Sequence, residues 1–305
     1  MFQFRTMKLV HKYLSLCYNK NMKTVIKYKE YEATISTLGA EVLELKKNGS
    51  NILWNRDGNY WGDSALVLFP FVGRNYDDTY TYRGKQYNIG IHGFGPKSEF
   101  SIVDVNDNSL TLSLSDNEET RKVYPFHFAF NITYSLSDDG LNIDFNVTNK
   151  SQDVMPFTMG YHPGFMLDKE LCHYKVKFEN VSEPKEVCIV TKCMLTGETE
   201  DLVLNNNELA LSPSLFTESA KIYAGVGNVV SLLDENDTEI VKLQYDGFEN
   251  IVLWQTLNSD AKFICIEGWR GLPGTFQHID DIEKVENKTF LNPDTNIKYS
   301  ARIIF

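Results

Sequence analysis

The stretch FHFAFNITYSLSDDGLNIDFNV, residues 126–147, sets the fold class of this 305-residue chain. Apolar residues alternate with polar or small ones through two runs, which the turn-forming residues Asp138, Asp139 and Gly140 separate. A period of two places the apolar side chains of each run on one face of a β-strand. The stretch therefore predicts an antiparallel hairpin with one buried face.

The same alternation continues over almost the whole sequence from Met22 onward. In the second half of the chain, strands are expected at residues 175–178, 187–190, 221–223, 229–233, 240–245, 250–254 and 263–266. Only residues 207–218 and 278–286 are expected to hold short helical turns. No repeat, linker or low-complexity tract divides the chain. The sequence therefore predicts an all-β, single-domain antiparallel sandwich of two packed sheets over residues 22–305.

Residues 1–21 differ from the rest of the sequence. They carry basic residues, and Lys8, His11 and Lys12 interrupt any apolar core of the kind that a signal peptide has. We expect this segment to be a leader outside the main fold, with a short amphipathic helix as the alternative.

The composition limits the function. A net charge of −11 disfavours binding to nucleic acid, whose phosphates would be repelled. No run of about eighteen apolar residues exists, so no membrane-spanning helix is expected. The odd number of cysteines suits a reducing compartment and predicts a cytoplasmic protein with free thiols and no metal site, at Cys17, Cys172, Cys188, Cys193 and Cys265.

Residues 68–100 contain the first candidate for a functional site. A short apolar run ends at Arg74, a hairpin is expected around the turn Arg83-Gly84-Lys85, and His92 follows beside Gly93. Glycines next to a polar side chain let the backbone or a ligand approach closely. On this stretch alone, a buried histidine that satisfies its own hydrogen bonds is the more common explanation.

Two further segments have the same character. TMGYHPGF, residues 158–165, places His162 after a glycine-containing run and before a proline that fixes the local backbone. FICIEGWRGLP, residues 263–273, ends an apolar strand in Glu267. That carboxylate is either a structural acid, paired for example with Arg270, or a group whose pKa is tuned for proton transfer.

The order and wording of four motifs resemble the aldose 1-epimerase (galactose mutarotase) superfamily, and most closely its LacX-like bacterial branch. The motifs are LFPFVGR at 68–74, HGF at 92–94, GYHPGF at 160–165 and IEGWRGLP at 266–273. The YPF at 124–126 and Asn149 also fit, and the resemblance covers residues 22–305. It implies a β-supersandwich of the galactose mutarotase type with a sugar cleft on one sheet.

The resemblance also implies roles for individual residues. Glu267 takes the position of the general base, His162 that of the general acid, and His92 that of a group that polarises the sugar. Substrate-binding positions fall on Arg74, Asn75, Tyr161, Trp269 and Ser219, and Phe94 is expected to offer a further apolar face. Two positions depart from the family pattern: Ser219 stands where an aspartate is usual, and Pro96, followed by Lys97, replaces the arginine that often follows HGF.

The implied activity is the interconversion of the α and β anomers of a free hexose. The reaction removes a proton from the C1 hydroxyl and protonates the ring oxygen, which requires one base and one acid but no metal or cofactor. The expected partner is a small sugar, with the chain a monomer or homodimer and with neutral aldoses preferred over phosphates. A catalytically silent carbohydrate-binding protein and a hexose-6-phosphate 1-epimerase remain alternatives.

Overall fold

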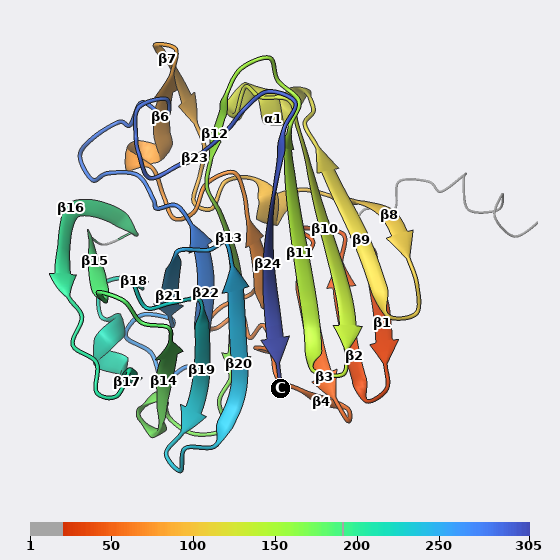
Figure 1. The fold of residues 1–305 in the computed structure, drawn as a ribbon, viewed down its shortest axis with the longest axis vertical. Coiled ribbons are helices and arrows are strands. Elements are labelled where there is room, and N and C mark those ends of the chain that lie inside the picture. The colour runs from red at the N-terminus through yellow and green to blue at the C-terminus, as the bar shows by residue number, and fades with distance from the viewer. Residues whose placement is uncertain (1–20, 191) are drawn as a thin grey trace, which may run out of the picture.

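The computed structural model describes residues 21–190 and 192–305, which form antiparallel β-sheets packed on one another (Figure 1). Except for Asn21, the predicted leader lies outside the described residues. The larger sheet has nine strands in the order β17 (Glu208–Ala210), β14 (Tyr174–Glu179), β19 (Val229–Asp234), β20 (Glu239–Asp246), β24 (Asn296–Ile304), β11 (Gly140–Asn149), β10 (Phe128–Ser137), β9 (Ser109–Ser115) and β8 (Ser101–Val105).

The second large sheet has seven strands. Their order is β16 (Met194–Asp201), β15 (Lys185–Val190), β18 (Lys221–Ala224), β21 (Asn250–Trp254), β22 (Phe263–Arg270), β13 (Met159–Met166) and β5 (Ala65–Leu68). All the strands expected in the second half of the chain are present in the two large sheets, which confirms the all-β prediction.

Three small sheets complete the fold. They consist of β1 (Lys23–Tyr28), β2 (Tyr31–Ser36), β3 (Val42–Lys47) and β4 (Ser50–Asn51), of β12 (Met155–Phe157) with β23 (Thr289–Leu291), and of β6 (Thr79–Tyr82) with β7 (Lys85–Asn88). The β6–β7 pair is the hairpin predicted around Arg83 and Gly84.

Helix is confined to short pieces in the described residues. One 3-10 turn, Pro213–Phe216, falls in the predicted segment 207–218. Residues 278–286 form a turn in which the N–H groups of Lys284 and Val285 donate to Asp281 O, but no longer helix. The helix α1 (Glu118–Val123) was not predicted, although its cap is readable in the sequence. The side chain of Asn117 accepts hydrogen bonds from the N–H groups of Glu119 and Thr120.

The main core lies between the two large sheets. On β10 the residues Phe128, Phe130, Ile132 and Tyr134 are fully buried, and β11 pairs with this strand through a hairpin that turns at Ser137 and Gly140. The alternation in residues 126–147 thus produces the predicted hairpin with one apolar face inside. None of the described helices is long and apolar enough to span a bilayer.

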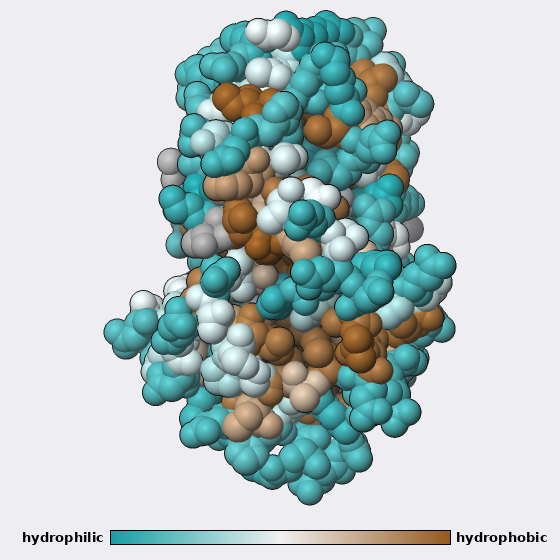
Figure 2. Space-filling view, turned by 90° about the vertical axis from the view of Figure 1, so that its left-hand side faces the viewer, coloured by the Kyte–Doolittle hydropathy of each residue, from teal (hydrophilic) through white to brown (hydrophobic). Residues whose placement is uncertain are grey.

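The seven-stranded sheet is apolar on both faces. Tyr161 and Phe165 on β13 join the main core, whereas Leu66 on β5 and Trp269 on β22 belong to a separate apolar cluster on the opposite face. Seen from the side of β15 and β16, apolar residues gather in a hollowed region of the surface with hydrophilic residues around it (Figure 2). A hollowed apolar surface on the outer face of a sheet is a candidate binding site for a ligand.

Candidate active site

Two neighbouring strands of the seven-stranded sheet bring His162 and Glu267 together. β13 and β22 are paired with Tyr161 opposite Gly268 and Gly164 opposite Cys265, so His162 and Glu267 project from the same face. His162 Nε2 lies 3.2 Å from Glu267 Oε1. The two residues are 6% and 1% exposed, so an imidazole and a carboxyl group meet almost out of contact with water.

The glycines of GYHPGF make space for the rings beside His162. A Cβ on Gly160 would lie 2.7 Å from Trp269 Cδ1, and a Cβ on Gly164 would lie 2.7 Å from Trp61 Cζ3. These glycines stand two residues before and after His162, on the same face of β13. The motif therefore admits an indole ring on each side of the histidine.

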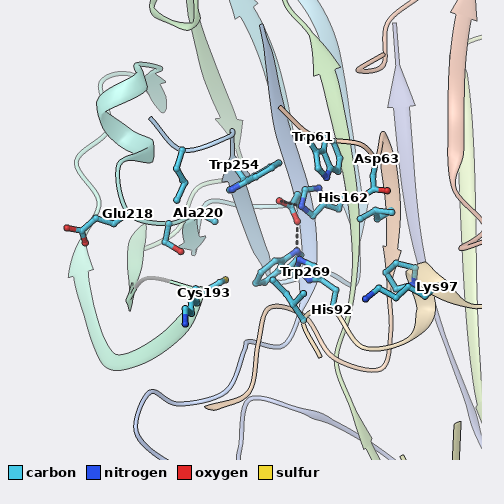
Figure 3. Close-up of a pocket in the computed structure, with 17 residues that line it drawn as sticks. Trp61, Asp63, His92, Lys97, His162, Cys193, Glu218, Ala220, Trp254 and Trp269 are labelled. Carbon is cyan, nitrogen blue, oxygen red and sulfur yellow. Dashed lines mark hydrogen bonds and ion pairs between the residues drawn. The ribbon is translucent and has the colours of Figure 1, made fainter. Parts of the chain in front are cut away.

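A hollow of about 520 Å³ opens in front of this pair, a size typical of small-molecule sites. Of the residues proposed from the sequence, Glu267, His162, His92, Trp269 and Ser219 line it. In Figure 3, Trp61 and Trp254 lie on one side of His162, and Trp269 and His92 lie on the other. The structure thus joins three motifs that are far apart in the sequence.

Burial controls the protonation of the pair. It raises the pKa of Glu267 well above the ordinary glutamate value, an effect opposed by the indole of Trp269, whose Nε1–H donates to Glu267 Oε2 at 2.7 Å. Burial likewise lowers the pKa of His162 well below that of an ordinary histidine, with a further contribution from His92. His162 Nδ1 is buried and has no hydrogen-bond partner among the described residues. Both groups therefore favour their uncharged forms.

Glu267 is not paired with Arg270, which the sequence left as a possibility. Arg270 Nη1 instead lies 2.6 Å from Glu249 Oε2, and Arg270 Nε donates to the hydroxyl of Thr289. The carboxyl group of Glu267 therefore has no cationic partner from the motif that carries it.

His92 is held by the backbone in an unusual conformation. Its φ of 61° lies in the left-handed region, its N–H donates to Gly73 O at 2.8 Å, and the Gly73 N–H donates to His92 Nδ1 at 3.1 Å. Since Nδ1 accepts a hydrogen bond, the ring hydrogen of the neutral imidazole sits on Nε2. Burial, assisted by the nearby positive charge of Arg74, lowers the pKa of His92 to about 3. His92 is therefore a neutral hydrogen-bond donor at the edge of the hollow.

Four residues expected to contact the substrate lie elsewhere. Tyr161 is fully buried in the main core, because it directly precedes His162 on β13 and its side chain therefore points to the opposite face of the sheet. Phe94 packs against the same core, and its ring stacks on Phe128. Asn75 is buried beside Gly274. Arg74 faces a neighbouring hollow, where its Nη1 lies 2.6 Å from Asp78 Oδ1.

Sequence reasoning missed the aromatic wall of the hollow. The ring centroids of Trp61 and Trp254 lie 5.0 and 5.7 Å from that of His162. Trp254 ends a predicted strand and lies opposite Cys265 on β22, on the face that carries Glu267. This position depends on strand pairing, which the sequence does not specify. Trp61 lies outside the strands, and its only sequence signal is the glycine at position 164 that accommodates its ring.

Charged side chains of both signs lie around the hollow. Asp63 and Lys97 lie at one end and Glu218 lies toward the other, on the side of the buried thiol of Cys193 (Figure 3). Lys192 also lines the hollow. Within residues 21–190 and 192–305, no group of three or more histidine, cysteine, aspartate or glutamate side chains is arranged to hold a metal ion.

Comparison with known proteins agrees with this fold. The model of the aldose 1-epimerase family matches residues 22–303. Protein LacX of Lactococcus lactis subsp. lactis, in its plasmid form, is 30% identical over 281 residues, which cover 86% of this chain and 92% of LacX.

Solved structures give the same result. A galactose mutarotase-like protein from Lactobacillus casei ATCC 334 superposes with a TM-score of 0.88 at 26% identity, covering 93% of this chain and 99% of that one. A galactose mutarotase related enzyme from Lactobacillus acidophilus superposes with a TM-score of 0.85 at 30% identity, covering 93% and 98%. The chain belongs to the aldose 1-epimerase family and has the fold of the galactose mutarotase-like proteins.

Proposed function

We propose that this protein is an aldose 1-epimerase that interconverts the α and β anomers of a free hexose. The observation that carries the proposal is the buried contact between His162 Nε2 and Glu267 Oε1, 3.2 Å apart at the wall of a hollow of sugar-binding size. Anomer exchange needs one group that accepts a proton and one that donates a proton within reach of a single pyranose ring.

The reaction follows from this pair. The one proton of the pair first moves from Glu267 to His162, which leaves a carboxylate and an imidazolium. Glu267 then accepts the proton of the C1 hydroxyl, the bond between C1 and the ring oxygen breaks, and His162 delivers its proton to that oxygen. The product is the open-chain aldehyde, which rotates about the bond between C1 and C2 and closes on its other face with both transfers reversed. The pair holds the same number of protons before and after ring opening. An arrangement in which one proton moves between two groups suits a reaction that runs in both directions.

The other walls of the hollow support this chemistry. His92 offers a neutral N–H that stabilises negative charge developing on a substrate oxygen, since its Nδ1 is occupied by the Gly73 N–H. Trp269 holds one carboxylate oxygen of Glu267 and leaves the other facing His162. The indole faces of Trp61 and Trp254 supply apolar surface for the C–H side of a sugar ring.

The charge balance around the hollow favours a neutral hexose. Lys97 and Lys192 are opposed by Asp63 and Glu218, and no arginine lines the wall within the described residues. Recognition of a phosphate usually relies on arginine forks or clusters of backbone N–H groups. We therefore expect kcat/KM for glucose to exceed that for glucose 6-phosphate.

Polarimetry tests the proposal directly. The optical rotation of freshly dissolved α-glucose and α-galactose should relax faster with protein than without it. If glucose 6-phosphate is the better substrate, the proposed substrate class changes from free hexoses to sugar phosphates. Sugar binding measured by calorimetry without any acceleration would identify a silent carbohydrate-binding protein, in keeping with Ser219 at the usual aspartate position.

A further inference from the structure

Lys288 carries an ammonium group into the interior of the protein. The residue precedes β23 and is 6% exposed, and its Nζ lies 5.6 Å from the centre of the Phe71 ring. Burial lowers the pKa of Lys288 to about 8, against the attraction of Asp280, so the group is mostly protonated at neutral pH. A buried charge is costly, and the reaction proposed above does not use this one. Its contacts indicate what it does instead.

The ammonium group holds the loop of residues 272–275, which follows β22. Lys288 Nζ donates to Leu272 O at 3.2 Å and to Asn287 Oδ1 at 3.1 Å. The backbone oxygen of Asn287 accepts from the Leu272 N–H at 3.2 Å, and its side-chain amide donates to Pro273 O at 3.3 Å. The first two residues of the loop are thus bound to residues 287 and 288.

A buried carboxyl group holds the other end of the loop. Asp280 is 1% exposed, and its Oδ2 accepts from the Thr275 N–H at 3.2 Å. Its Oδ1 makes no hydrogen bond to any described residue. Asp280 also attracts the charge of Lys288, although the two groups lie too far apart for a direct ion pair. The loop is therefore held between an ammonium group at Leu272 and a carboxyl group at Thr275.

The loop packs closely against the segment of residues 71–74. The Gly274 N–H donates to Arg74 O at 3.0 Å. A Cβ on Gly73 would lie 2.7 Å from Pro273 Cβ, so the two backbones leave no space between them. A displacement of the loop would therefore displace this segment as well.

The same segment fixes His92 at the edge of the active-site hollow. Gly73 accepts from the His92 N–H and donates to His92 Nδ1. Lys288 thus reaches the hydrogen-bond partner of His92 by two routes, one through the ring of Phe71 and one through the loop. Groups that contact a reacting molecule need such support from the residues behind them to keep their orientation.

We propose that Lys288 is a positioning residue for the epimerase reaction, because it holds the loop against Gly73 and so keeps His92 in place as a hydrogen-bond donor. The inference rests on the proposed function. Lys288 is not among the residues that line the hollow, so its influence on a sugar has to pass through His92.

The first test is kinetic and uses the full chain. Lys288→Met removes the ammonium group and keeps a long side chain. By polarimetry, kcat for glucose should fall about 10-fold with little change in KM. This loss is smaller than the roughly 100-fold or greater loss expected when a donor is removed, because His92 is displaced and not deleted. In a His92→Phe background, Lys288→Met should lower kcat no further, since the residue through which it acts is gone. A second 10-fold loss there would overturn the proposal.

The second test is hydrogen exchange at the Gly73 amide, measured by NMR, which does not depend on activity. The bond to His92 Nδ1 protects this amide in the unmodified chain. Lys288→Met should speed its exchange by at least about tenfold. Leu291→Ala on β23 is the matched control, because Leu291 is buried in the main core and pairs with Met155. It should lower the melting temperature but change neither Gly73 exchange nor kcat per folded molecule.

The two tests separate the positioning role from the activity. Unchanged Gly73 exchange in Lys288→Met, or equal effects of Lys288→Met and Leu291→Ala, would refute the role of Lys288 alone. If the unmodified chain does not accelerate the relaxation of glucose, the epimerase proposal fails, and Gly73 exchange still decides whether Lys288 holds the segment that binds His92.

A second variant covers the case in which Lys288→Met does not fold. Asn287→Ala removes the side-chain bonds to Pro273 O and to Lys288 Nζ while keeping the ammonium group. It should speed Gly73 exchange in the same direction, and an unchanged rate would refute the link between this loop and His92.

Discussion

Single residues decide the protonation chemistry of this site. Glu267 and His162 are ionisable groups that have lost their hydration and face each other. The motifs in the sequence identified both groups, but their separation depends on strand pairing between residues more than a hundred positions apart. The motif suggested that Tyr161 binds the substrate, whereas its side chain lies in the core. Strand alternation predicts this correctly, because the neighbouring residue His162 faces the hollow.

Removing either proton-transfer group should abolish most of the activity. Glu267→Gln and His162→Asn are each expected to lower kcat at least about 100-fold, the usual effect of losing a general acid or base, with a smaller change in KM. Glu267→Gln keeps an oxygen that can accept from Trp269. Polarimetry gives kcat, and thermal denaturation checks that the variants fold. A variant that loses stability but keeps its turnover per folded molecule would make Glu267 a structural acid.

The activity should span a broad range of pH. The working state of the pair contains one shared proton, and burial disfavours both the state with one more proton and the state with one fewer. At low pH, activity is lost when the imidazole of His162 gains a proton. Burial lowers the pKa of this imidazole from 6.5, so activity is kept as the pH falls through 6.5. At high pH, activity is lost when the carboxyl group of Glu267 loses its proton. Burial raises the pKa of this carboxyl group from 4.5, so activity persists above pH 4.5.

A profile of kcat/KM from about pH 4 to about pH 9 measures these limits, which belong to the pair as a whole. If maximal activity is confined to the pH range between the ordinary pKa values of glutamate and histidine, burial does not shift the pKa values of the pair as proposed.

At the scale of elements, the pairing of β13 with β22 builds the site. The apolar run at 263–266 was sufficient to predict that β22 is a strand. The segment of β13 was not predicted as a strand, because Gly160, Pro163 and Gly164 interrupt its apolar residues. Strand alternation also could not show that Trp61, which lies outside the strands, reaches the hollow, since that contact depends on the path of a connecting segment.

The glycine at position 160 offers a test of this arrangement. Gly160→Ala places a methyl group 2.7 Å from Trp269 Cδ1, so the indole must move and its hydrogen bond to Glu267 is disturbed. We expect a clear loss of kcat together with a destabilisation of about 1–3 kcal/mol. Gly268→Ala adds the same group on the core face, against the ring of Tyr245. It should lower the melting temperature and affect kcat less. Equal losses of kcat would show that Trp269 has no special part in orienting Glu267.

For the whole molecule, the class of fold was predictable and the order of strands was not. Alternation counts strands and shows which residues are buried, but the nine-stranded order joins β24 to β11 and β20 across long separations in sequence. Only the four motifs, through their resemblance to a family, connected the sequence to this topology.

The predicted boundary at Met22 can be tested at this scale. The described sheets begin with Lys23 in β1, and the family match begins at residue 22. A chain starting at Met22 should therefore melt within a few degrees of the full chain and keep its kcat. Differential scanning calorimetry of both chains makes the comparison. A fall of ten degrees or more, roughly several kcal/mol for a protein of this size, would mean that the leader is part of the fold.

The position of β24 has a consequence for biosynthesis. This strand follows every other strand in the sequence, yet it lies in the interior of the nine-stranded sheet, where it alone joins β11 to β20. During translation both neighbours therefore leave the ribosome with an unpaired edge, and the sheet closes only after residue 304 has emerged. Unpaired edges invite association with other chains. The nascent polypeptide is thus most prone to aggregate in the interval just before its last strand is released, and slow decoding of that final segment would prolong the exposure.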